Sequence, residues 1–327
     1  MGQLILRREF SKLLNRLFLS KSIWKNDSRI VAIDYHYFCN GDNLQYEDLE
    51  VSYEVLSKQL EIISKDCCPS EAISALNEIY GTSTLKKVDP KVIISVDDAD
   101  RSIKKAIKLF KKFDLPIIIF APVGLCLEKD SLDGMRSKCF LYYSELCNKI
   151  DFGADMKDKN AFFEKIMSCS NYQLSMHLRE LEKLPRNQSV TGSRNLLSLK
   201  ELKEIAQSPH VTVASHSMSH NILSELPLRW LRWEISQSLA YINQINGNSQ
   251  LFCYPFGYKK SYNKNVQLIL AEEGVKYSFT TVSTIINKNS NPLSLGRTGM
   301  LNFANKNYVM GSIRGAFYIW DLILHRT

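Results

Sequence analysis

Two histidines stand four residues apart in the segment ASHSMSH at residues 214–220, directly after a short apolar run. If the chain turns into a helix here, the imidazoles of His216 and His220 point to one side, as two ligands of one metal ion require. Taken alone, such a pair is more often a capping or core pair whose nitrogens are satisfied by hydrogen bonds. The metal interpretation therefore needs a further ligand elsewhere in the chain.

Asp97 and Asp98 are adjacent carboxylates that also follow an apolar run. At the end of a strand the backbone can turn, so one carboxylate can bind a metal while the other stays free as a base. Two histidines and Asp98, with one position left open, describe a catalytic zinc site or a related divalent site. The alternative is that residues 97–100 cap the helix that begins near Ser102, and Asp100 is assigned that role.

Short β-branched runs predict buried strands, and amphipathic patterns predict helices between them. The strands are expected at residues 29–34, 92–96, 117–120 and 211–214, with weaker ones at 251–254 and 277–280. The clearest helices are expected at residues 102–113, 198–207, 228–245 and 264–273. This alternation indicates a parallel sheet covered by helices, and the carboxyl ends of its strands would line the active site. Polar or unusual residues follow the strands at 97–98, 215–216 and 255–257.

Three of these segments resemble, in order, the motifs of the NodB-type polysaccharide deacetylases. Residues 92–124, with VDDAD, resemble the first motif, residues 214–220 match the H-[ST]-xx-H motif, and YPFG at 254–257 resembles the third. LGR at 295–297 is similar to an arginine-bearing strand of relatives that act on surface polysaccharides, and DYH at 34–36 resembles a Tyr-His pair near the start of such proteins. The resemblance covers roughly residues 29–300.

The resemblance implies an α/β fold, a distorted (β/α) barrel with seven parallel strands, and a hydrolase that depends on a divalent metal, with zinc expected. It assigns the general base to Asp97 and the metal ligands to Asp98, His216 and His220. The backbone N–H of Phe256 would help to hold the oxyanion of the tetrahedral intermediate.

The resemblance also implies a substrate pocket near the third motif. Tyr254 and Pro255 would form its wall, with Gly257 beside them. His36 would lie in this pocket, although a histidine satisfied in the core or in a loop is an equal alternative.

The chain departs from the family pattern at three places. Ala99 stands where the first motif has glycine, and Cys253 stands where an arginine often opens the third motif. We expect Arg297 to take the place of that arginine by fixing Asp97 electrostatically. The late Leu-x-His motif, which supplies the general acid in the family, has no clear counterpart, and His325 is the candidate for the acid.

Two segments lie outside the repeating pattern. Residues 4–21 carry an apolar stripe flanked by arginines and lysines, which predicts a basic amphipathic helix within an N-terminal segment of residues 1–28. The barrel would then occupy residues 29–327. Residues 126–195 are interpreted as a helical insertion that sits over the strand ends and shapes substrate access.

Composition and charge limit the location and the partners. The 327 residues carry a net charge of +8, and no export signal or membrane-length apolar stretch is evident. We therefore expect a cytoplasmic protein, bound peripherally to the inner face of the cytoplasmic membrane through its N-terminal helix or packed without membrane contact. An anionic sugar carrier would suit the charge, whereas nucleic acid is not expected as a partner because no recognised motif is present.

Taken together, the sequence predicts a hydrolase that removes an N-acetyl or related acyl group from a sugar in polysaccharide or glycolipid biosynthesis. The acetylated substrate would be polymeric, lipid-linked or nucleotide-linked. The alternatives are a catalytically silent carbohydrate-binding relative and a deformylase or O-deacetylase of a lipid-linked sugar. Metal content together with acetate release separates an enzyme from a binding protein.

Overall fold

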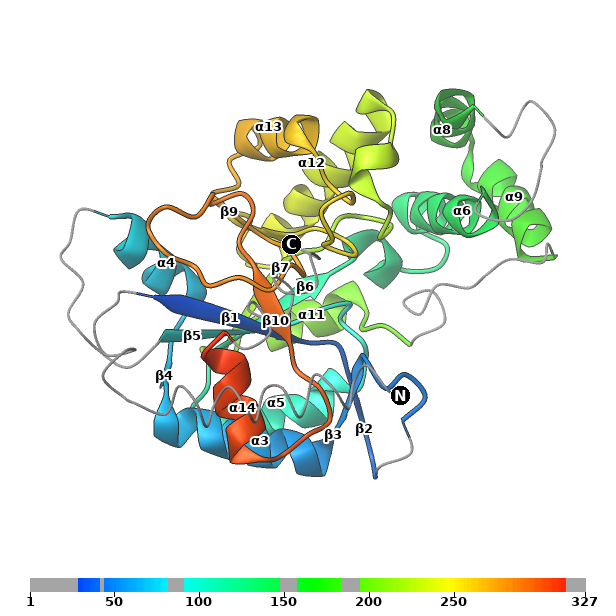
Figure 1. Cartoon of the computed structure of the whole chain (residues 1–327). Coiled ribbons are helices and arrows are strands. Elements are labelled where there is room, and N and C mark those ends of the chain that lie inside the picture. Colours follow the sequence, from blue (N-terminus) through cyan, green and yellow to red (C-terminus); the bar gives the residue numbers. More distant parts are fainter. Residues whose placement is uncertain (1–28, 42–43, 82–90, 148–157, 184–194, 316–327) are drawn as a thin grey trace.

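The computed structural model describes residues 29–41, 44–81, 91–147, 158–183 and 195–315. Its centre is a sheet whose main path contains seven parallel strands in the order β10-β1-β5-β6-β7-β8-β9 (Figure 1). Their bounds are β1 Ile30–Tyr35, β5 Lys91–Val96, β6 Ile117–Ala121, β7 Val211–Ser215, β8 Leu251–Cys253, β9 Tyr277–Phe279 and β10 Arg297–Gly299. Off this path, β4 (Cys68–Pro69) pairs with β5, while β2 (Tyr37–Cys39) and β3 (Glu50–Ser52) pair with each other.

The sheet curls until its two edges nearly meet. Leu295, which leads into β10, forms a parallel bridge with Phe279 at the end of β9. The N–H of Leu295 donates to the carbonyl of Ser278, and its own carbonyl accepts the N–H of Thr280, both at 2.8 Å. The predicted distorted barrel of seven parallel strands is thereby confirmed.

Continuous apolar runs form these strands because both faces of the sheet are buried. In β5, Val92 and Ile94 pack outward under the helices, whereas Ile93 belongs to a second cluster that includes Ile118 and Phe120. The sheet therefore carries one apolar cluster inside the barrel and two on its outer face. The predicted strands agree with the observed ones to within about a residue at each end.

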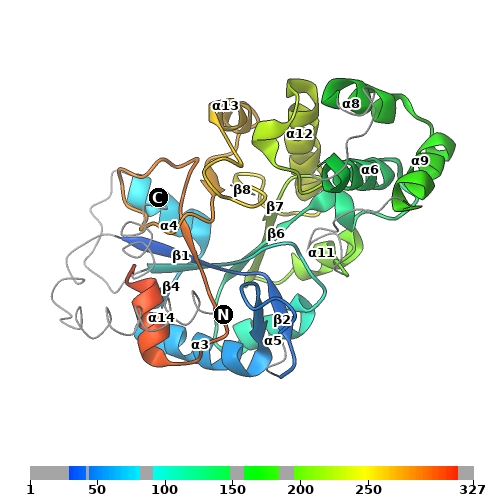
Figure 2. The same ribbon diagram turned by 45° about the vertical axis from the view of Figure 1, so that its right-hand side comes forward.

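Helices cover the outside of the barrel, with α3 (Tyr53–Asp66), α5 (Ile103–Lys112) and α14 (Lys306–Ile313) below and α12 (Leu228–Gln244) and α13 (Lys264–Glu272) above in the views of Figures 1 and 2. The helices predicted at residues 102–113, 198–207, 228–245 and 264–273 are present. No helix in the described part of the chain has both the length and the apolar character to cross a membrane. The α-helices are α3 Tyr53–Asp66, α4 Ala72–Tyr80, α5 Ile103–Lys112, α6 Leu132–Cys147, α8 Lys159–Ser168, α9 Asn171–Lys183, α11 Leu199–Ile205, α12 Leu228–Gln244, α13 Lys264–Glu272 and α14 Lys306–Ile313, and the short 3-10 helices are η1 Val123–Cys126 and η2 Leu223–Glu225.

The predicted helical insertion contains α6, α8 and α9, which lie together beside α12 (Figure 2). The centre of its contact with α12 is aromatic: the rings of Phe140 and Trp230 have centroids 4.4 Å apart, and Phe163 stacks on Trp230 at 5.9 Å. The insertion is thus held to the side of the barrel by ring packing. The predicted N-terminal helix at residues 4–21 lies outside the described residues, so the membrane-surface location stays a prediction.

Candidate active site

Asp97 and Asp98 lie in a tight turn directly after β5. The backbone N–H of Asp97 still bonds to the carbonyl of Tyr35 in β1 at 2.9 Å, so the first aspartate is fixed by the sheet. Asp98 and Ala99 then adopt positive φ angles of 68° and 53°. Residues other than glycine rarely adopt this conformation, and it clusters at functional sites because the surroundings must hold it. Here the carbonyl of Ala99 accepts the N–H of Leu197 at 2.9 Å.

His216 and His220 lie in a loop after β7, and not in a helix as the spacing suggested. Ser217 and His220 have φ angles of 66° and 58°, so the loop curls back on itself. The two ring centroids are 4.9 Å apart. The expected convergence of the imidazoles is therefore present, although a strained loop produces it.

Glu234, a fully buried residue of α12, braces this histidine loop. Its carboxylate accepts the backbone N–H groups of Met218 and Ser219, both at 2.9 Å, and also the hydroxyl of Ser219. The indole N–H of Trp230 donates to the same carboxylate at 3.0 Å. This buried carboxylate accepts four hydrogen bonds, which satisfy the backbone N–H groups of the loop and fix the loop to α12.

Asp98, His216 and His220 present three buried ligand atoms that lie within 4.8 Å of one another. Oδ1 of Asp98 is 3.2 Å from Nε2 of His220 and 3.8 Å from Nε2 of His216. Nδ1 of His216 lies 2.8 Å from the carbonyl of Cys253. When the Nδ1–H donates a hydrogen bond to that carbonyl, Nε2 carries the lone pair that can bind a metal ion. Burial lowers the pKa of His216 to about 4 despite the opposing effect of Asp97, so the ring is neutral, as a metal ligand must be. This donor set suits a divalent ion such as zinc.

The second oxygen of Asp98 is held separately. The hydroxyl of Tyr37, a fully buried residue of β2, donates a hydrogen bond to Oδ2. Tyr37 therefore fixes the orientation in which Oδ1 of Asp98 faces the two histidines. Tyr37 is not among the site residues predicted from the sequence, and its position directly after the DYH segment at residues 34–36 is the one signal that points to it.

Asp97 is paired with Arg297 instead. The guanidinium donates from Nη1 to Oδ1 and from Nη2 to Oδ2, both at 2.7 Å, and the two side chains are 0% and 2% exposed. Arg297 also donates to Oγ of Ser95 at 2.9 Å and to the carbonyl of Thr280 at 3.0 Å. The expectation that Arg297 fixes Asp97 thus has a direct geometric basis in this two-point contact.

The ion pair controls the charge of Asp97. Burial alone would raise the pKa of this carboxyl group, but the guanidinium of Arg297 lowers it to about 2, with smaller contributions from His216 and His36. Because this value lies below the ~3.9 of an unfolded aspartate, the pair stabilises the fold above about pH 4, and that stabilisation is lost as the pH falls through about 2. Asp97 is therefore a carboxylate at any physiological pH.

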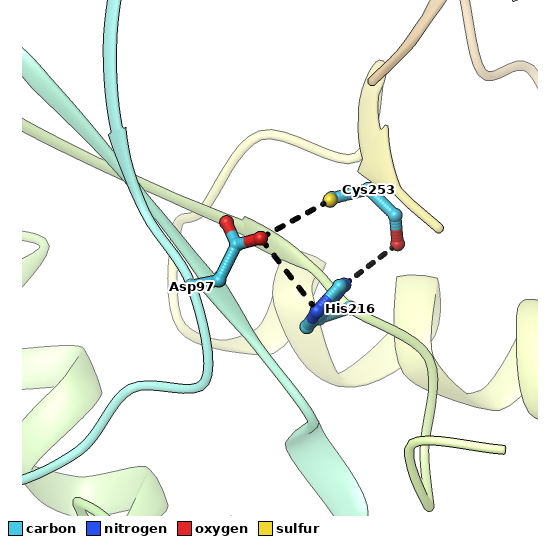
Figure 3. Close-up of side chains that lie close together, drawn as sticks. All are labelled: Asp97, His216 and Cys253. Carbon is cyan, nitrogen blue, oxygen red and sulfur yellow. Dashed lines mark hydrogen bonds and ion pairs between the residues drawn. The ribbon is translucent and has the colours of Figure 1, made fainter. Parts of the chain in front are cut away.

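A second group, Asp97, His216 and Cys253, also has the geometry to hold a metal ion (Figure 3). Its chemistry argues against that use. Nη2 of Arg297 lies 3.0 Å from the sulfur of Cys253, and Nη1 and Nη2 together occupy both oxygens of Asp97, so a cation there would face the guanidinium. Burial raises the pKa of the Cys253 thiol well above its ordinary value, whereas a metal ligand must be a thiolate. The set with Asp98 is the better metal site.

A cavity of about 470 Å³ opens over these groups. Seven of the predicted site residues line it, together with Tyr37, Asp34, Ser283 and Thr298. The seven are Asp97, Asp98, His216, His220, Arg297, Phe256 and His36.

The loop after β8 contributes Phe256 to the cavity, but the other predicted pocket residues support it from behind. Tyr254 is buried, donates to the carbonyl of Leu293 at 2.7 Å and stacks on Tyr262, so it does not form the pocket wall as predicted. Neither Pro255 nor Gly257 is among the lining residues. Gly257 has φ +65°, and a Cβ at this position would lie 2.5 Å from the backbone nitrogen of Thr281. Of residues 254–257, Phe256 alone lines the cavity.

His36 stands at the junction of β1 and β2. Its Nε2 lies 3.9 Å from Oδ2 of Asp97, and its Nδ1 lies 3.7 Å from Oδ2 of Asp34. The sequence left two positions open for His36, in the substrate pocket or in the core or a loop, and the structure places it in the cavity. His325, the predicted acid, lies outside the described residues.

We expect Tyr37→Phe to weaken metal binding by about 10–100-fold, because outer partners of a ligand orient it toward the ion. The measurement is zinc affinity by competition with a chromogenic chelator. Tyr35→Phe is the matched control, since its buried hydroxyl donates to Gln59 at 3.0 Å and not to the site. That control should lose about 1 kcal/mol of stability and keep its zinc affinity. Equal affinity in wild type and Tyr37→Phe would contradict the assignment.

Comparisons with known proteins agree with this geometry. Residues 180–278 match the family model described as polysaccharide deacetylase. The solved structure of the deacetylase PplD from Streptococcus pyogenes, in complex with acetate, is 18% identical, with a TM-score of 0.60 over 87% of this chain and 98% of that one. A comparison with curated protein sequences finds no match.

Two further solved structures have the same fold. IcaB from Ammonifex degensii is 15% identical, with a TM-score of 0.57 over 88% of this chain and 97% of that one. A de-N-acetylase from Aggregatibacter actinomycetemcomitans is 14% identical, with a TM-score of 0.54 over 85% and 96%. The family match confirms the hydrolase class that the motifs indicated. The chain therefore matches the polysaccharide deacetylase family over residues 180–278 and shares the fold of these deacetylases.

Proposed function

We propose that this chain is a metal-dependent deacetylase that removes an N-acetyl or related acyl group from a sugar in polysaccharide or glycolipid biosynthesis. One observation carries the proposal: an ionised Asp97 lies 3.9 Å from His216, beside a complete set of metal ligands in the same cavity. The description of the matched family supports the type of bond. So does the de-N-acetylase activity named for one of the structural neighbours.

Asp97 is the base in this mechanism. It takes a proton from the water that attacks the acyl carbon, and Arg297 holds its carboxylate in place through two hydrogen bonds. A divalent ion held by Asp98, His216 and His220 would polarise the acyl carbonyl and lower the pKa of the attacking water. That contribution matters here because a carboxylate with a pKa of about 2 is by itself a weak base.

Phe256 supplies a backbone donor for the oxyanion. Phe256 lines the cavity in a turn with φ +63°, and the structure shows no hydrogen bond from its N–H to any of the described residues. A donor that is fixed before the reaction can stabilise the charge that develops on the carbonyl oxygen. The strain at Phe256 therefore has a use in the reaction.

We assign the general acid to His36. When the C–N bond breaks, the departing nitrogen needs a proton, and His36 faces the cavity beside Asp97 with Asp34 behind its Nδ1. Histidine is the residue type that exchanges protons most readily near neutral pH. Carboxylate and amine are then released, and His36 performs the step for which His325 was the sequence-based candidate.

The alternatives differ in what they require of the site. A silent carbohydrate-binding relative would not need Asp97 to be buried beside the metal ligands at the cost of desolvation. Deformylation or O-deacetylation would use the same groups, since the same carbonyl chemistry serves each bond. Cleavage of a C–N bond is favoured over O-deacetylation because His36 offers a proton that an amine leaving group needs more than an alcohol does.

Asp97→Asn should retain zinc and lose turnover by about 10²–10⁴-fold, because the amide cannot accept the proton. Acetate release from N-acetylglucosamine oligomers measures turnover, and metal content is measured on the same samples. Asp100→Asn is the matched control, since an asparagine oxygen can still accept the N–H of Ser102 as Asp100 does at 2.9 Å. Turnover of Asp97→Asn within a few-fold of wild type would overturn the assignment of the base.

His36→Ala should slow the release of acetate from N-acetyl sugars by about 10²–10⁴-fold. It should slow the hydrolysis of an aryl acetate far less, because a phenolate leaves without being protonated. His210→Ala, at a histidine 3.5 Å from Asp114 and away from the cavity, serves as the control. An equal loss on both substrates would show that His36 does not act as the acid.

A further inference from the structure

Helix α5 carries a row of positive charge on its outer side. Five of its ten residues are lysines, and none is acidic. All five lysines are exposed, whereas the apolar residues at the intervening positions are mostly buried. Because residues three, four or seven positions apart lie on the same side of a helix, the lysines share one face. This lysine face consists of Lys104, Lys105, Lys108, Lys111 and Lys112.

The spacing of the lysines works against the stability of the helix. Lys108 is four residues from both Lys104 and Lys112, and like charges at this spacing destabilise a helix. An anionic partner on the face would weaken this repulsion. The row therefore suits a surface whose charge is balanced from outside the chain.

Neighbouring acidic side chains neutralise little of this charge. Lys104 pairs with Glu201 of α11 at 2.5 Å, but Glu201 also pairs with Arg101, so two cations share one acid. Neither Lys108 nor Lys111 forms an ion pair within the part of the chain that the structure describes. The centre of the lysine face therefore keeps its full positive charge.

At the two ends of the face, the ammonium groups lie on uncharged partners. Nζ of Lys105 is 4.1 Å from the ring centroid of Tyr53 and donates to Oδ1 of Asn40 at 2.7 Å. Nζ of Lys112 is 5.0 Å from the ring centroid of Phe113, which is half-buried. These contacts hold the side chains without cancelling their charge. Lysines beside a partly exposed ring form the mixed surface that rests well on lipid headgroups.

The lysine face is separate from the active-site cavity. None of its lysines is among the residues that line the cavity. Helix α5 lies beside α3 on the lower side of the barrel, away from α12 and α13 (Figures 1 and 2). The charge of this face is therefore available to a partner other than the substrate in the cavity.

We propose that the lysine face of α5 binds the surface of an anionic lipid bilayer. A row of side chains along the outside of a helix fits a planar partner, whereas a polymer is better held in a groove. Its cations are lysines, which lack the planar fork with which arginine grips a single phosphate or carboxylate, so the face suits charge that is spread over many headgroups. The proposal goes beyond the proposed function and concerns residues other than the basic segment at 4–21.

The test is sedimentation of the full-length protein with vesicles of phosphatidylglycerol and phosphatidylcholine. The double variant Lys108→Gln/Lys111→Gln should bind these vesicles about 10- to 30-fold more weakly, because each lysine near an anionic surface contributes about five-fold. The difference should shrink at about 0.5 M salt, where charges are screened within a few ångströms. Lys108→Arg/Lys111→Arg should bind as wild type does, because it keeps both charges.

The matched control is Lys264→Gln/Lys276→Gln, which removes two exposed lysines at the start of α13 and just after it. Helix α13 lies on the opposite side of the barrel from α5 (Figure 1). The control lowers the net charge by the same amount and should weaken binding by less than about two-fold, because distant charges are screened. Thermal unfolding of both double variants checks that they remain folded.

The inference is overturned if Lys108→Gln/Lys111→Gln binds the vesicles as tightly as wild type, or if wild type does not bind them. An equal loss in the α13 control also overturns it, because binding would then follow net charge and not this face. Weaker binding of the α5 variant to soluble polyglutamate, with vesicle binding unchanged, would assign the face to an acidic polymer instead. Acetate release plays no part in the measurement, so its outcome is independent of the proposed function.

Discussion

The buried contact between Arg297 and Asp97 is the constraint on which the site depends. Two adjacent carboxylates in one cavity would repel each other, and each would favour its neutral form when buried. The guanidinium removes this conflict for Asp97, while His220 and Tyr37 hold Asp98. The two aspartates thus keep their charge by different means, which is why one can serve as base and the other as ligand.

The closure of the barrel brings Arg297 to Asp97. Arg297 begins β10, which pairs with β1 at one edge of the sheet, while Leu295 bridges to β9 at the other edge. Closure therefore brings the guanidinium inside the barrel, where it lies over the ring of Phe120. Cys253, at the position where relatives often have arginine, is small enough to leave room for it and contacts Nη2 at 3.0 Å. With Cys253 in the third motif, the positive charge beside Asp97 is thus supplied by Arg297 from β10. A buried pair of this kind costs desolvation, and removing one partner typically destabilises a protein by about 3–5 kcal/mol.

Much of the fold could be predicted from the sequence because buried parallel strands are continuous apolar runs. β10 was harder, since only three residues pair there and two of them are Arg297 and Thr298. The site residues at the strand ends were also predictable, because Asp97, Asp98, His216 and His220 are polar residues where the pattern expects a loop.

What the sequence did not reveal depends on backbone turns and on long-range contacts. The spacing of the histidines suggested a helix, whereas positive φ angles and the buried carboxylate of Glu234 bring them together. Tyr254 was expected to face the pocket, but Phe256, two residues later, does so, because the chain makes a tight turn with positive φ at Phe256. No local pattern reports that Tyr37 reaches Asp98, 61 residues away in sequence.

The central claim is that a metal ion binds to Asp98, His216 and His220 and leaves Asp97 to act as a base. X-ray absorption at the zinc edge of the zinc-loaded protein tests it directly, because the two sets of ligands differ in sulfur. The account predicts one zinc ion with nitrogen and oxygen neighbours at about 2.0–2.2 Å and no sulfur neighbour. A zinc–sulfur distance of about 2.3 Å, which Cys253→Ser removes, would place the ion between Asp97, His216 and Cys253 and would contradict the account.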